Sequence, residues 1–342
     1  MSCVRRDIGY RLGPPWPLLA LLVCTLHAAE LPLQVTTHPA DDFSPSLSPD
    51  GRWVAFTSRR SGNLDIWVRP VRGGRAYQIT THQADDFAPA WSPDGQRLAF
   101  VSKRSDAAGD IWMVEVRRTD SRVVPSADPI RITNHLGQDC SPCFSPDGKE
   151  LAFCSDRSGR LEVWVLVLAK RILTRATFRG GTEPSWSPDG VWLAYTAFDS
   201  LHQHSAIAVT PAHPEARPDL PREIALTDGS WLDCQPAWSP SGGEVVFCRF
   251  PYDTNHDGRI TLDDQPVLIR AAISLPTRPS QLPSAPAAVQ LWLTSGAHFD
   301  FAPRWENGDL VCFTSDRGGN LDIWALPPQG LIPRQSSAAA QL

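Results

Sequence analysis

Two stretches of the chain read almost identically: DDFSPSLSPDG at Asp41–Gly51 and DDFAPAWSPDG at Asp85–Gly95. The second copy begins 44 positions after the first. A repeat at this period is typical of one supersecondary unit that is stacked several times in the fold. The pair therefore predicts further copies along the 342 residues.

The unit occurs six times. In each copy a short strand containing proline leads through a tight turn into an alternating apolar strand, and a polar turn then leads into a third strand, mostly of the Asp-Ile-Trp type. A fourth short strand precedes the next copy. The first strands lie at 45–48, 89–92, 142–145, 184–187, 236–239 and 303–306. Six units of four short strands predict an all-β fold, a six-bladed β-propeller of four-stranded antiparallel blades.

Each part of the repeat has a local physical cause. Proline fixes the entry to the turn, and the glycine of Pro-Asp-Gly adopts the positive φ that a tight hairpin needs. Alternating strands such as WVAFTS (53–58) direct successive side chains to opposite faces, where neighbouring blades can bury both. The recurring tryptophans supply large apolar surfaces for packing one blade against the next.

The two ends of the repeat region complement each other. LQVTTH (33–38) resembles a fourth strand but stands before the first complete copy, whereas the last copy ends after its third strand, DIWALP (322–327). We therefore expect the N-terminal strand to complete the sixth blade and so close the ring, which removes an exposed edge. The expected propeller domain spans 30–326, and the tail at 327–342 is expected to be disordered.

The N-terminus has the composition of a secretory signal. Three arginines within the first eleven residues precede an apolar run at 16–26, and Ala28 and Ala29 follow. The run is too short to favour a membrane span. We expect residues 1–29 to be a signal peptide and the mature protein to be periplasmic or secreted without a membrane span. Lipid attachment at Cys24 is not expected, because Val23 stands where a small residue is needed.

Composition narrows the range of partners. The formal net charge is -5, so the chain has no basic footprint for nucleic acid. An oxidising compartment would permit disulfides among the cysteines that remain after signal removal, and a structural role is favoured for them. These cysteines are Cys140, Cys143, Cys154, Cys234, Cys248 and Cys312.

The motifs W-S-P-D-G, I-A-F-x-S-D-R-x-G and D-I-W resemble those of the TolB-like family of β-propellers over roughly residues 31–326. The resemblance implies protein or peptide binding by the propeller. TolB also carries an N-terminal α/β domain, for which we expect no counterpart here, and a specific role in the Tol envelope system is therefore not implied.

Acidic residues recur just before the first strands, where the topology predicts the mouth of the central channel. A ring of carboxylates there could bind a cation or a basic peptide, although capping of local backbone amides is the alternative. The ring comprises Asp42, Asp86, Asp139, Asp233 and Asp300, and Gly181 interrupts it in the fourth copy.

Other repeat positions are expected to be structural. Asp65, Asp110 and Asp322, which precede Ile-Trp, should bond neighbouring backbone, and Arg157 and Arg317 should be structural too. Proline-rich connections at 118–129, 211–222 and 275–287 are expected to be solvated spacers that do not pack.

The fifth copy contains the strongest metal motif, DTNHDGRITLDD at 253–264. Its spacing matches a calcium loop, with side-chain oxygens at positions 1, 3 and 5, a backbone carbonyl at 7 and a closing carboxylate at 12. The expected ligands are Asp253, Asn255, Asp257, Arg259, Thr261 and Asp264. Gly258 permits the sharp bend, and Ile260 should anchor the loop by burial. His202 and His204 are expected to be solvent-exposed.

Three classes of function are considered, and the enzymatic class has two variants. A non-enzymatic scaffold that binds an envelope protein or peptide at the channel face is favoured. A prolyl-oligopeptidase-like peptidase is excluded, because the chain has no G-x-S-x-G motif and no residues for a hydrolase domain. A metal-dependent lyase would need several histidines near the channel, and His38, His82 and His135 do recur there. Binding of a cell-wall polysaccharide stays open as a third function.

Overall fold

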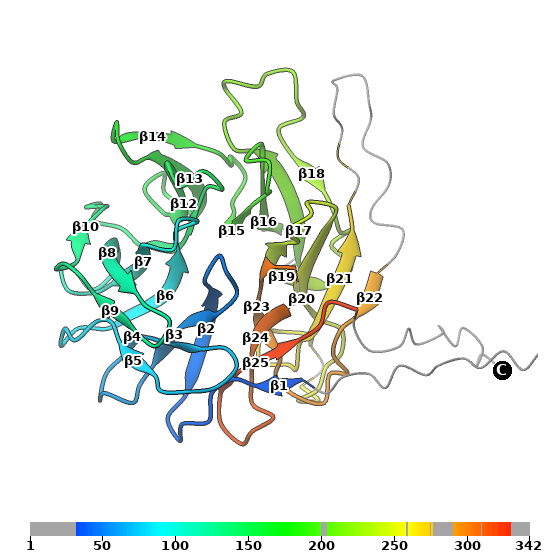
Figure 1. Ribbon diagram of the computed structural model, residues 1–342. Helices are drawn as coiled ribbons and strands as arrows, with labels where there is room; N and C mark the ends of the chain where they lie inside the picture. The colour runs from blue at the N-terminus through cyan, green and yellow to red at the C-terminus, as the bar shows by residue number, and fades with distance from the viewer. Residues whose placement is uncertain are drawn as a thin grey trace, which may run out of the picture.

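The computed structural model describes residues 32–199, 204–257, 259–273, 275, 290–308 and 310–329. The predicted signal peptide and most of the predicted tail lie outside these ranges. All regular secondary structure in the described part is β-strand, and the strands form antiparallel blades arranged around a common centre (Figure 1). The predicted all-β propeller fold is therefore confirmed.

The first three blades follow the chain without interruption. In each of them the first strand is innermost and successive strands pair outward. Blade 1 contains β2 (Asp42–Leu47), β3 (Trp53–Ser58), β4 (Asp65–Pro70) and β5 (Tyr77–Gln78). Blade 2 contains β6 (Asp86–Trp91), β7 (Arg97–Ser102), β8 (Asp110–Arg118) and β10 (Ile130–Arg131), with β9 (Val123–Pro125) beside β8. Blade 3 contains β11 (Asp139–Phe144), β12 (Glu150–Ser155), β13 (Glu162–Val167) and β14 (Ile172–Arg175).

Blades 4 and 5 share one hydrogen-bonded sheet, because Ser205 of β17 bridges Leu232 of β19 in parallel. Blade 4 contains β15 (Thr182–Trp186), β16 (Trp192–Asp199), β17 (His204–Pro211) and β18 (Ile224–Ala225). Blade 5 contains β19 (Leu232–Trp238), β20 (Glu244–Phe250), β21 (Val267–Ala272) and β22 (Gln290–Trp292). Blade 6 contains β23 (Phe301–Asn307), β24 (Leu310–Ser315), β25 (Asp322–Leu326) and β1 (Leu33–Gln34).

The N-terminal strand occupies the position that the sequence predicts for it. Leu33 of β1 pairs with Ala325 of β25, and Gln34 pairs with Trp324, so strands from the two ends of the propeller share one blade. Figure 1 shows β1 beside β25 at the junction between the first and last blades. The outer edge of blade 6 is thereby paired.

The hydrophobic core lies between blades. Each buried apolar cluster draws its residues from two neighbouring blades, and six such clusters occur in the described part of the chain. The cluster between the last and first blades includes Val35, Phe56 and Ile323. Because blades 6 and 1 share a core in the same way as the other neighbours, apolar packing joins the two ends of the chain.

Every innermost strand contains a bulge, and most of these bulges link neighbouring blades. One residue per strand has a φ between 50° and 57°, and the register of the ladder shifts beside it. In five of these strands the N–H of the bulged residue donates to a side chain of the preceding blade; for example, Ala88 donates to Thr57 Oγ1 at 3.1 Å, and Gln235 donates to Thr196 Oγ1 at 3.0 Å. The bulged residues are Ser44, Ala88, Ser141, Glu183, Gln235 and Ala302.

Two of the proline-rich connections pack against the blades, contrary to the sequence prediction. Val123 is fully buried where β9 pairs with β8, and Leu220 is 5% exposed in the cluster between blades 4 and 5. Burial of these apolar side chains favours packing of each connection over its solvation. Most of the third connection, 275–287, lies outside the described residues.

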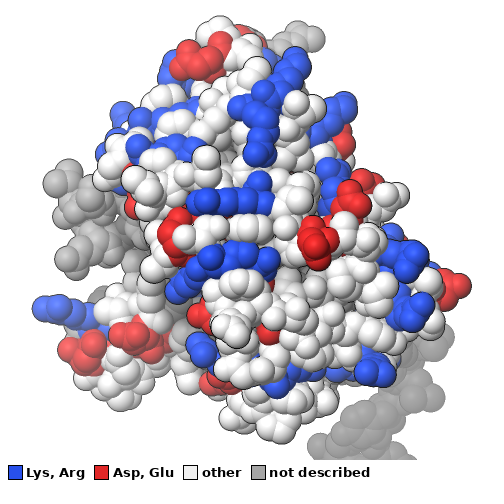
Figure 2. Space-filling view, turned by 90° about the vertical axis from the view of Figure 1, so that its left-hand side faces the viewer, with Lys and Arg blue, Asp and Glu red and all other residues white. Residues whose placement is uncertain are grey.

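Lysine and arginine side chains on the side of the propeller formed by blades 2 and 3 are interspersed with acidic and neutral residues (Figure 2). Among the described residues there is no helix with the length and apolar character of a membrane span.

Candidate functional site at the channel mouth

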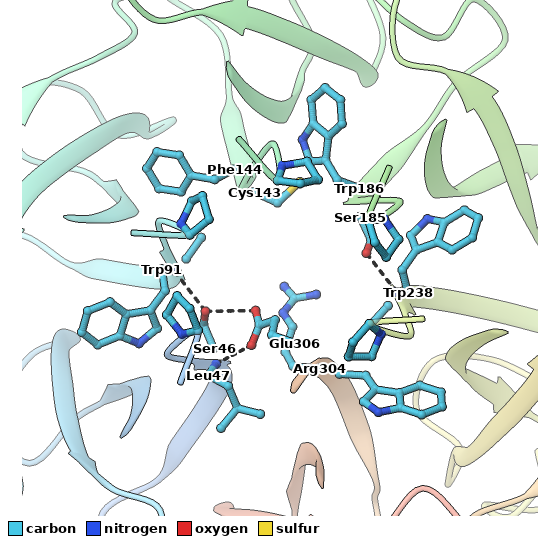
Figure 3. Close-up of a pocket in the computed structure, with 18 of the residues that line it drawn as sticks. Ser46, Leu47, Trp91, Cys143, Phe144, Ser185, Trp186, Trp238, Arg304 and Glu306 are labelled. Atoms are coloured by element: carbon cyan, nitrogen blue, oxygen red, sulfur yellow. Dashed lines mark hydrogen bonds between the residues drawn. The ribbon is translucent and has the colours of Figure 1, made fainter. Parts of the chain in front are cut away.

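A cavity of about 340 Å³ lies where the six innermost strands end, and we call it the channel mouth. Every blade contributes to its wall (Figure 3). The residues that define it are Ser46, Leu47, Ala90, Trp91, Cys143, Phe144, Ser185, Trp186, Ala237, Trp238, Arg304, Trp305 and Glu306, together with prolines such as Pro93 and Pro146.

The repeat itself builds this wall. At the end of an innermost strand the serine of Ser-Pro-Asp-Gly donates to the aspartate of the same turn, for example Ser92 Oγ to Asp94 Oδ1 at 2.5 Å. Gly95, with a φ of 65°, completes the turn and leaves no room for a Cβ beside the Arg118 guanidinium. The polar side chains of the turn thus hydrogen-bond to one another, so prolines and small side chains form most of the surface of the channel mouth.

The tryptophans of this wall point away from the channel. Figure 3 shows the rings of Trp91, Trp186 and Trp238 directed outward, and these residues are only 5–8% exposed. They are wedges between blades, and their large apolar surfaces hold the wall in place.

Blade 6 departs from this neutral pattern. Arg304 occupies the position of Ser46, Ala90, Cys143, Ser185 and Ala237 in the other blades, and Glu306 occupies the position of a serine such as Ser92. Both charged groups point toward the channel axis (Figure 3). Glu306 accepts hydrogen bonds from Ser46 Oγ at 3.2 Å and from the Leu47 N–H, so it ties blade 6 to blade 1.

Arg304 keeps its donors free. Among the described residues its guanidinium has no hydrogen-bond partner and no ion-pair partner. Enclosure in the mouth raises the pKa of the Glu306 carboxyl, while the Arg304 charge and the bonds from Leu47 and Ser46 act in the opposite direction. Among the described residues, the channel mouth therefore presents one guanidinium with five N–H donors that make no hydrogen bond, beside the Glu306 carboxyl and in a collar whose other side chains are uncharged.

The five acids predicted to line the channel lie at the other end of the innermost strands. Their side chains are 0–1% exposed, and each forms an ion pair with an arginine, which comes from the turn after the second strand in four blades and from the second strand itself, as Arg249, in blade 5. The Asp86 carboxylate, for example, lies 2.7 Å from Arg104 Nη2, and Arg104 Nε donates to Ser102 Oγ. The pairs are Asp42–Arg60, Asp86–Arg104, Asp139–Arg157, Asp233–Arg249 and Asp300–Arg317. This geometry gives the acids a structural role, and ligand binding by them stays a prediction.

The acids before Ile-Trp do not bond backbone as the sequence suggested. Asp322 instead accepts the Thr36 hydroxyl at 3.0 Å, and Asp65 accepts the Thr80 hydroxyl at 3.1 Å. A threonine of the fourth-strand segment takes the backbone contact in place of the aspartate. Thr36 Oγ1 donates to Asp322 and itself accepts the N–H of Ile323 at 2.8 Å. Asp110 is held by Arg131 Nη2 at 2.6 Å.

The three recurring histidines form hydrogen bonds within their own loops. The Nδ1 atoms of His38, His82 and His135 each accept the backbone N–H two residues later, at 2.9–3.0 Å. Within the described residues, no group of three or more His, Cys, Asp or Glu side chains is arranged to hold a metal ion.

The predicted calcium loop joins β20 to β21. The Asp257 N–H donates to Asp253 Oδ1 at 3.1 Å and to Asn255 Oδ1 at 3.0 Å, which brings the first three expected ligands together. Asp264 is fully buried and accepts the N–H groups of Thr254 and Thr261 at 2.7 and 2.8 Å. Ile260 is 39% exposed, so the expected anchoring by its burial is wrong. Gly258, His202 and the side chain of His204 lie outside the described residues.

Comparison with known proteins identifies the family. A model of the TolB β-propeller domain matches residues 82–264, more than half of the chain. The chain belongs to the TolB β-propeller family. A model of the tricorn protease N-terminal β-propeller domain also matches, over residues 26–123.

Individual TolB-type proteins match parts of the chain. A TolB homologue from Chlorobium luteolum is 32% identical over 135 residues, which is 40% of this chain and 28% of that protein. The structure of TolB from Acinetobacter baumannii matches with a TM-score of 0.55 and 22% identity over 70% of this chain and 53% of that one. Because so little of these proteins is spanned, the likeness carries over the fold and not the activity of the whole proteins.

Two further structures match over almost their full length. A TolB-type protein from Agrobacterium tumefaciens has a TM-score of 0.57 and 19% identity, over 86% of this chain and 92% of that one. An oligogalacturonate lyase from Vibrio parahaemolyticus has a TM-score of 0.51 and 13% identity over the same shares. At such identities the likeness shows the propeller fold alone.

The sequence analysis missed Arg304 and Glu306. The signal was nevertheless present, since the sixth copy reads PRWE where the others read PSLS, PAWS, PCFS or PSWS. A charged pair at two otherwise small positions is the kind of departure that marks a functional position in a repeat fold.

Proposed function

We propose that this TolB-family propeller is an exported, non-enzymatic scaffold that binds a segment of an envelope protein at the channel mouth. The observation that supports it is the Arg304 guanidinium, which makes no hydrogen bond among the described residues and stands beside Glu306 in a collar otherwise built of proline and uncharged side chains. The cavity is at the lower end of the range of about 300–1,000 Å³ that is usual for ligand sites.

The charge of the site suggests what part of the segment is held. A guanidinium presents a planar fork that matches a carboxylate in two parallel hydrogen bonds. The proposed ligand therefore places an Asp or Glu side chain, or a C-terminal carboxylate, at Arg304, while apolar side chains contact the prolines of the collar.

The test is selection of peptides from a random library on the wild-type propeller, followed by affinity measurement on two variants. Arg304→Gln should weaken the selected peptides by about 10- to 100-fold, the usual value of a hydrogen bond to a charged group. Lys149→Gln, which removes an exposed cation from a turn on the same face, is the control and should leave affinity unchanged. Equal effects of the two variants, or peptides without acids, would contradict the assignment.

Oligogalacturonate, an acidic polysaccharide, is the competing ligand in the same assay. Arg304-dependent binding of it in place of peptides would favour the carbohydrate alternative. Cleavage of it in the presence of added divalent metal would favour the lyase alternative and overturn the non-enzymatic assignment.

We also propose that the loop at 253–264 binds calcium and thereby stiffens the connection between β20 and β21. Support comes from the six expected ligands at calcium-loop spacing and from the clustering of Asp253, Asn255 and Asp257 through the Asp257 N–H. Among the described residues, Oδ2 of Asp264 accepts one hydrogen bond, from the Thr261 N–H, which leaves a lone pair for a cation.

Calorimetric titration of calcium into chelator-treated protein tests this loop. One saturable site is expected, and Asp257→Ala should weaken it by about tenfold or more, because it removes a charged ligand. Asp263→Ala, which removes a neighbouring exposed acid that is not among the six, should change little. Absence of saturable binding, or the same affinity in Asp257→Ala, would refute the site.

A further inference from the structure

Four cysteines of the propeller stand in two cross-strand pairs. Cys140 of β11 lies directly opposite Cys154 of β12 in blade 3, and Cys234 of β19 lies directly opposite Cys248 of β20 in blade 5. Both pairs join the innermost strand to the second strand of a blade, one residue before the bulge.

The same two positions can be compared in all six blades. In blades 3 and 5 both positions are cysteine, and in the other four blades neither position is. The remaining pairs in the same register are Phe43–Thr57, Phe87–Val101, Thr182–Thr196 and Phe301–Thr314. At this place in the repeat, cysteine therefore occurs on both strands together and never on one strand alone.

The backbone geometry suits a covalent link. Directly opposed residues of an antiparallel ladder have Cα atoms about 4.5–5.5 Å apart, and both side chains are on the same face. Disulfides span Cα separations of about 4.4–6.8 Å. The partner thiol is close enough in each pair to affect ionisation: Cys248 together with burial raises the pKa of Cys234, and burial together with Cys140 raises that of Cys154.

The other possible pairing in blade 3, Cys140 with Cys143, is disfavoured. Cys140 packs in the apolar cluster between blades 2 and 3, whereas Cys143 packs in the one between blades 3 and 4 and also lines the channel mouth. Across the bulge Cys143 lies opposite Ala152, two residues along β12 from Cys154, whereas Cys154 lies directly opposite Cys140 and is therefore the nearer partner.

We propose that Cys140–Cys154 and Cys234–Cys248 form disulfide bonds in the oxidised protein, and that Cys143 and Cys312 remain thiols. The co-reactant is a disulfide oxidant of low molecular weight or of a protein. The thiolate of one cysteine attacks it and expels one thiol, and the second cysteine then displaces the other thiol from the mixed disulfide. Each pair loses two protons and two electrons, and the oxidant leaves as two thiols.

Burial decides when this reaction occurs. Cys154 and Cys248 are fully buried, whereas Cys140 and Cys234 are partly exposed. Because the thiolate is the reactive form and burial raises the thiol pKa, oxidation is slow in the folded protein and fast during folding. The pairs are thus closed as the chain enters an oxidising compartment, which is the only step that rests on the proposed export.

The sulfur atoms also lie at joints between blades. Cys154 Sγ accepts the N–H of Glu183 in blade 4 at 3.0 Å, which is the role that Thr57 and Thr196 have at other joints. In the reduced protein the Cys248 thiol donates to Gln235 Oε1 at 3.3 Å, a bond that the disulfide gives up, while the same oxygen accepts the Ala302 N–H of blade 6 at 2.8 Å. The disulfides would therefore fix two inner strands whose ends form the channel mouth.

Refolding of the reduced full chain in a glutathione redox buffer tests the proposal without any dependence on export. After acid quenching, free thiols are alkylated and peptides are mapped by mass spectrometry without reductant. We expect linked peptides for 140–154 and 234–248, with Cys143 and Cys312 alkylated. Alkylated Cys140 or Cys234, or any other linkage among these six cysteines, overturns the proposal.

Two variants give matched controls because each introduces the residue of other blades. Cys154→Thr should leave Cys140 alkylated and the 234–248 link intact. Cys312→Ala, which copies the alanine of β3 and β7 at that position, should leave both links intact. Retention of a disulfide on Cys140 in Cys154→Thr would show that the pairing is wrong.

Discussion

At the residue scale, one arrangement recurs on the face opposite the channel mouth. A buried aspartate at the start of an innermost strand pairs with an arginine whose Nε donates, in four blades, to a serine of the second strand; two examples are Asp86 with Arg104 and Asp139 with Arg157. Such pairs cost desolvation energy when they form, but they cost more when one partner is lost. They determine the position of the turn that carries the arginine.

Asp86→Ala should therefore lower the free energy of unfolding by about 3–5 kcal/mol, because it leaves the Arg104 charge nearly buried without its partner. The measurement is urea unfolding of the variant and of the double variant Asp86→Ala/Arg104→Leu, which should recover part of the loss. Peptide binding is measured on the same proteins. A stable Asp86→Ala that loses ligand would return this acid to the ligand-binding role that the sequence suggested.

At the element scale, the fourth strand of each blade is short and is held by one threonine. Thr36 of the N-terminal segment and Thr80 of blade 1 have the same contacts. Each donates its hydroxyl hydrogen to the aspartate before Ile-Trp, and each hydroxyl oxygen accepts the backbone N–H of the isoleucine that follows this aspartate. The only difference is connectivity, since Thr36 comes from the opposite end of the chain to the strand that it meets.

Thr36→Val should cost as much stability as Thr80→Val, about 1–3 kcal/mol each, because either change leaves a buried aspartate oxygen and a buried N–H unsatisfied. Chemical unfolding of both variants measures the two costs. A full cost for Thr80→Val with none for Thr36→Val would show that the N-terminal strand does not close the ring in solution.

At the scale of the whole molecule, the carboxylates fall into two groups with opposite pH dependence. The Lys149 N–H and the Ser145 hydroxyl lower the pKa of the exposed Asp147 to about 2, so its contribution to stability is lost as pH falls from about 4 to 2. Burial, only partly offset by Arg131, raises the pKa of Asp110 to about 6. The stability that the protonated Asp110 carboxyl contributes is therefore present below about pH 4 and is lost as pH rises to about 6.

The variant Asp110→Asn removes the titration of Asp110 and so serves as the reference for its effect on stability. Relative to this variant, the wild-type protein should lose about 1–3 kcal/mol of unfolding free energy between about pH 4 and 6, and the difference should be constant above about pH 7. Thermal unfolding at a series of pH values gives the curve. A difference that grows in favour of the wild type as pH rises would mean that Arg131 lowers the pKa of Asp110 below its ordinary value.

The sequence by itself determined the architecture of this protein. Six copies of a strand-turn-strand pattern, with Pro-Asp-Gly turns and alternating apolar residues, specify blades through purely local rules. The unmatched fourth strand at 33–38 also pointed to its partner, Asp322–Leu326, because strand count alone shows which end is incomplete.

Only the tertiary structure decided which repeat residues are available to a ligand. Asp42 and Asp86 are polar and recur near the axis, so sequence spacing cannot distinguish a channel ligand from a buried ion pair, and their arginines come from turns 18 residues away. The orientation of Arg304 toward the axis, and its lack of a partner in the described part of the chain, depend on the bulges that set which side of each inner strand faces the channel. Cys154 and Cys248 face their partners for the same reason, because the register between strands belongs to the fold and not to the spacing along the chain.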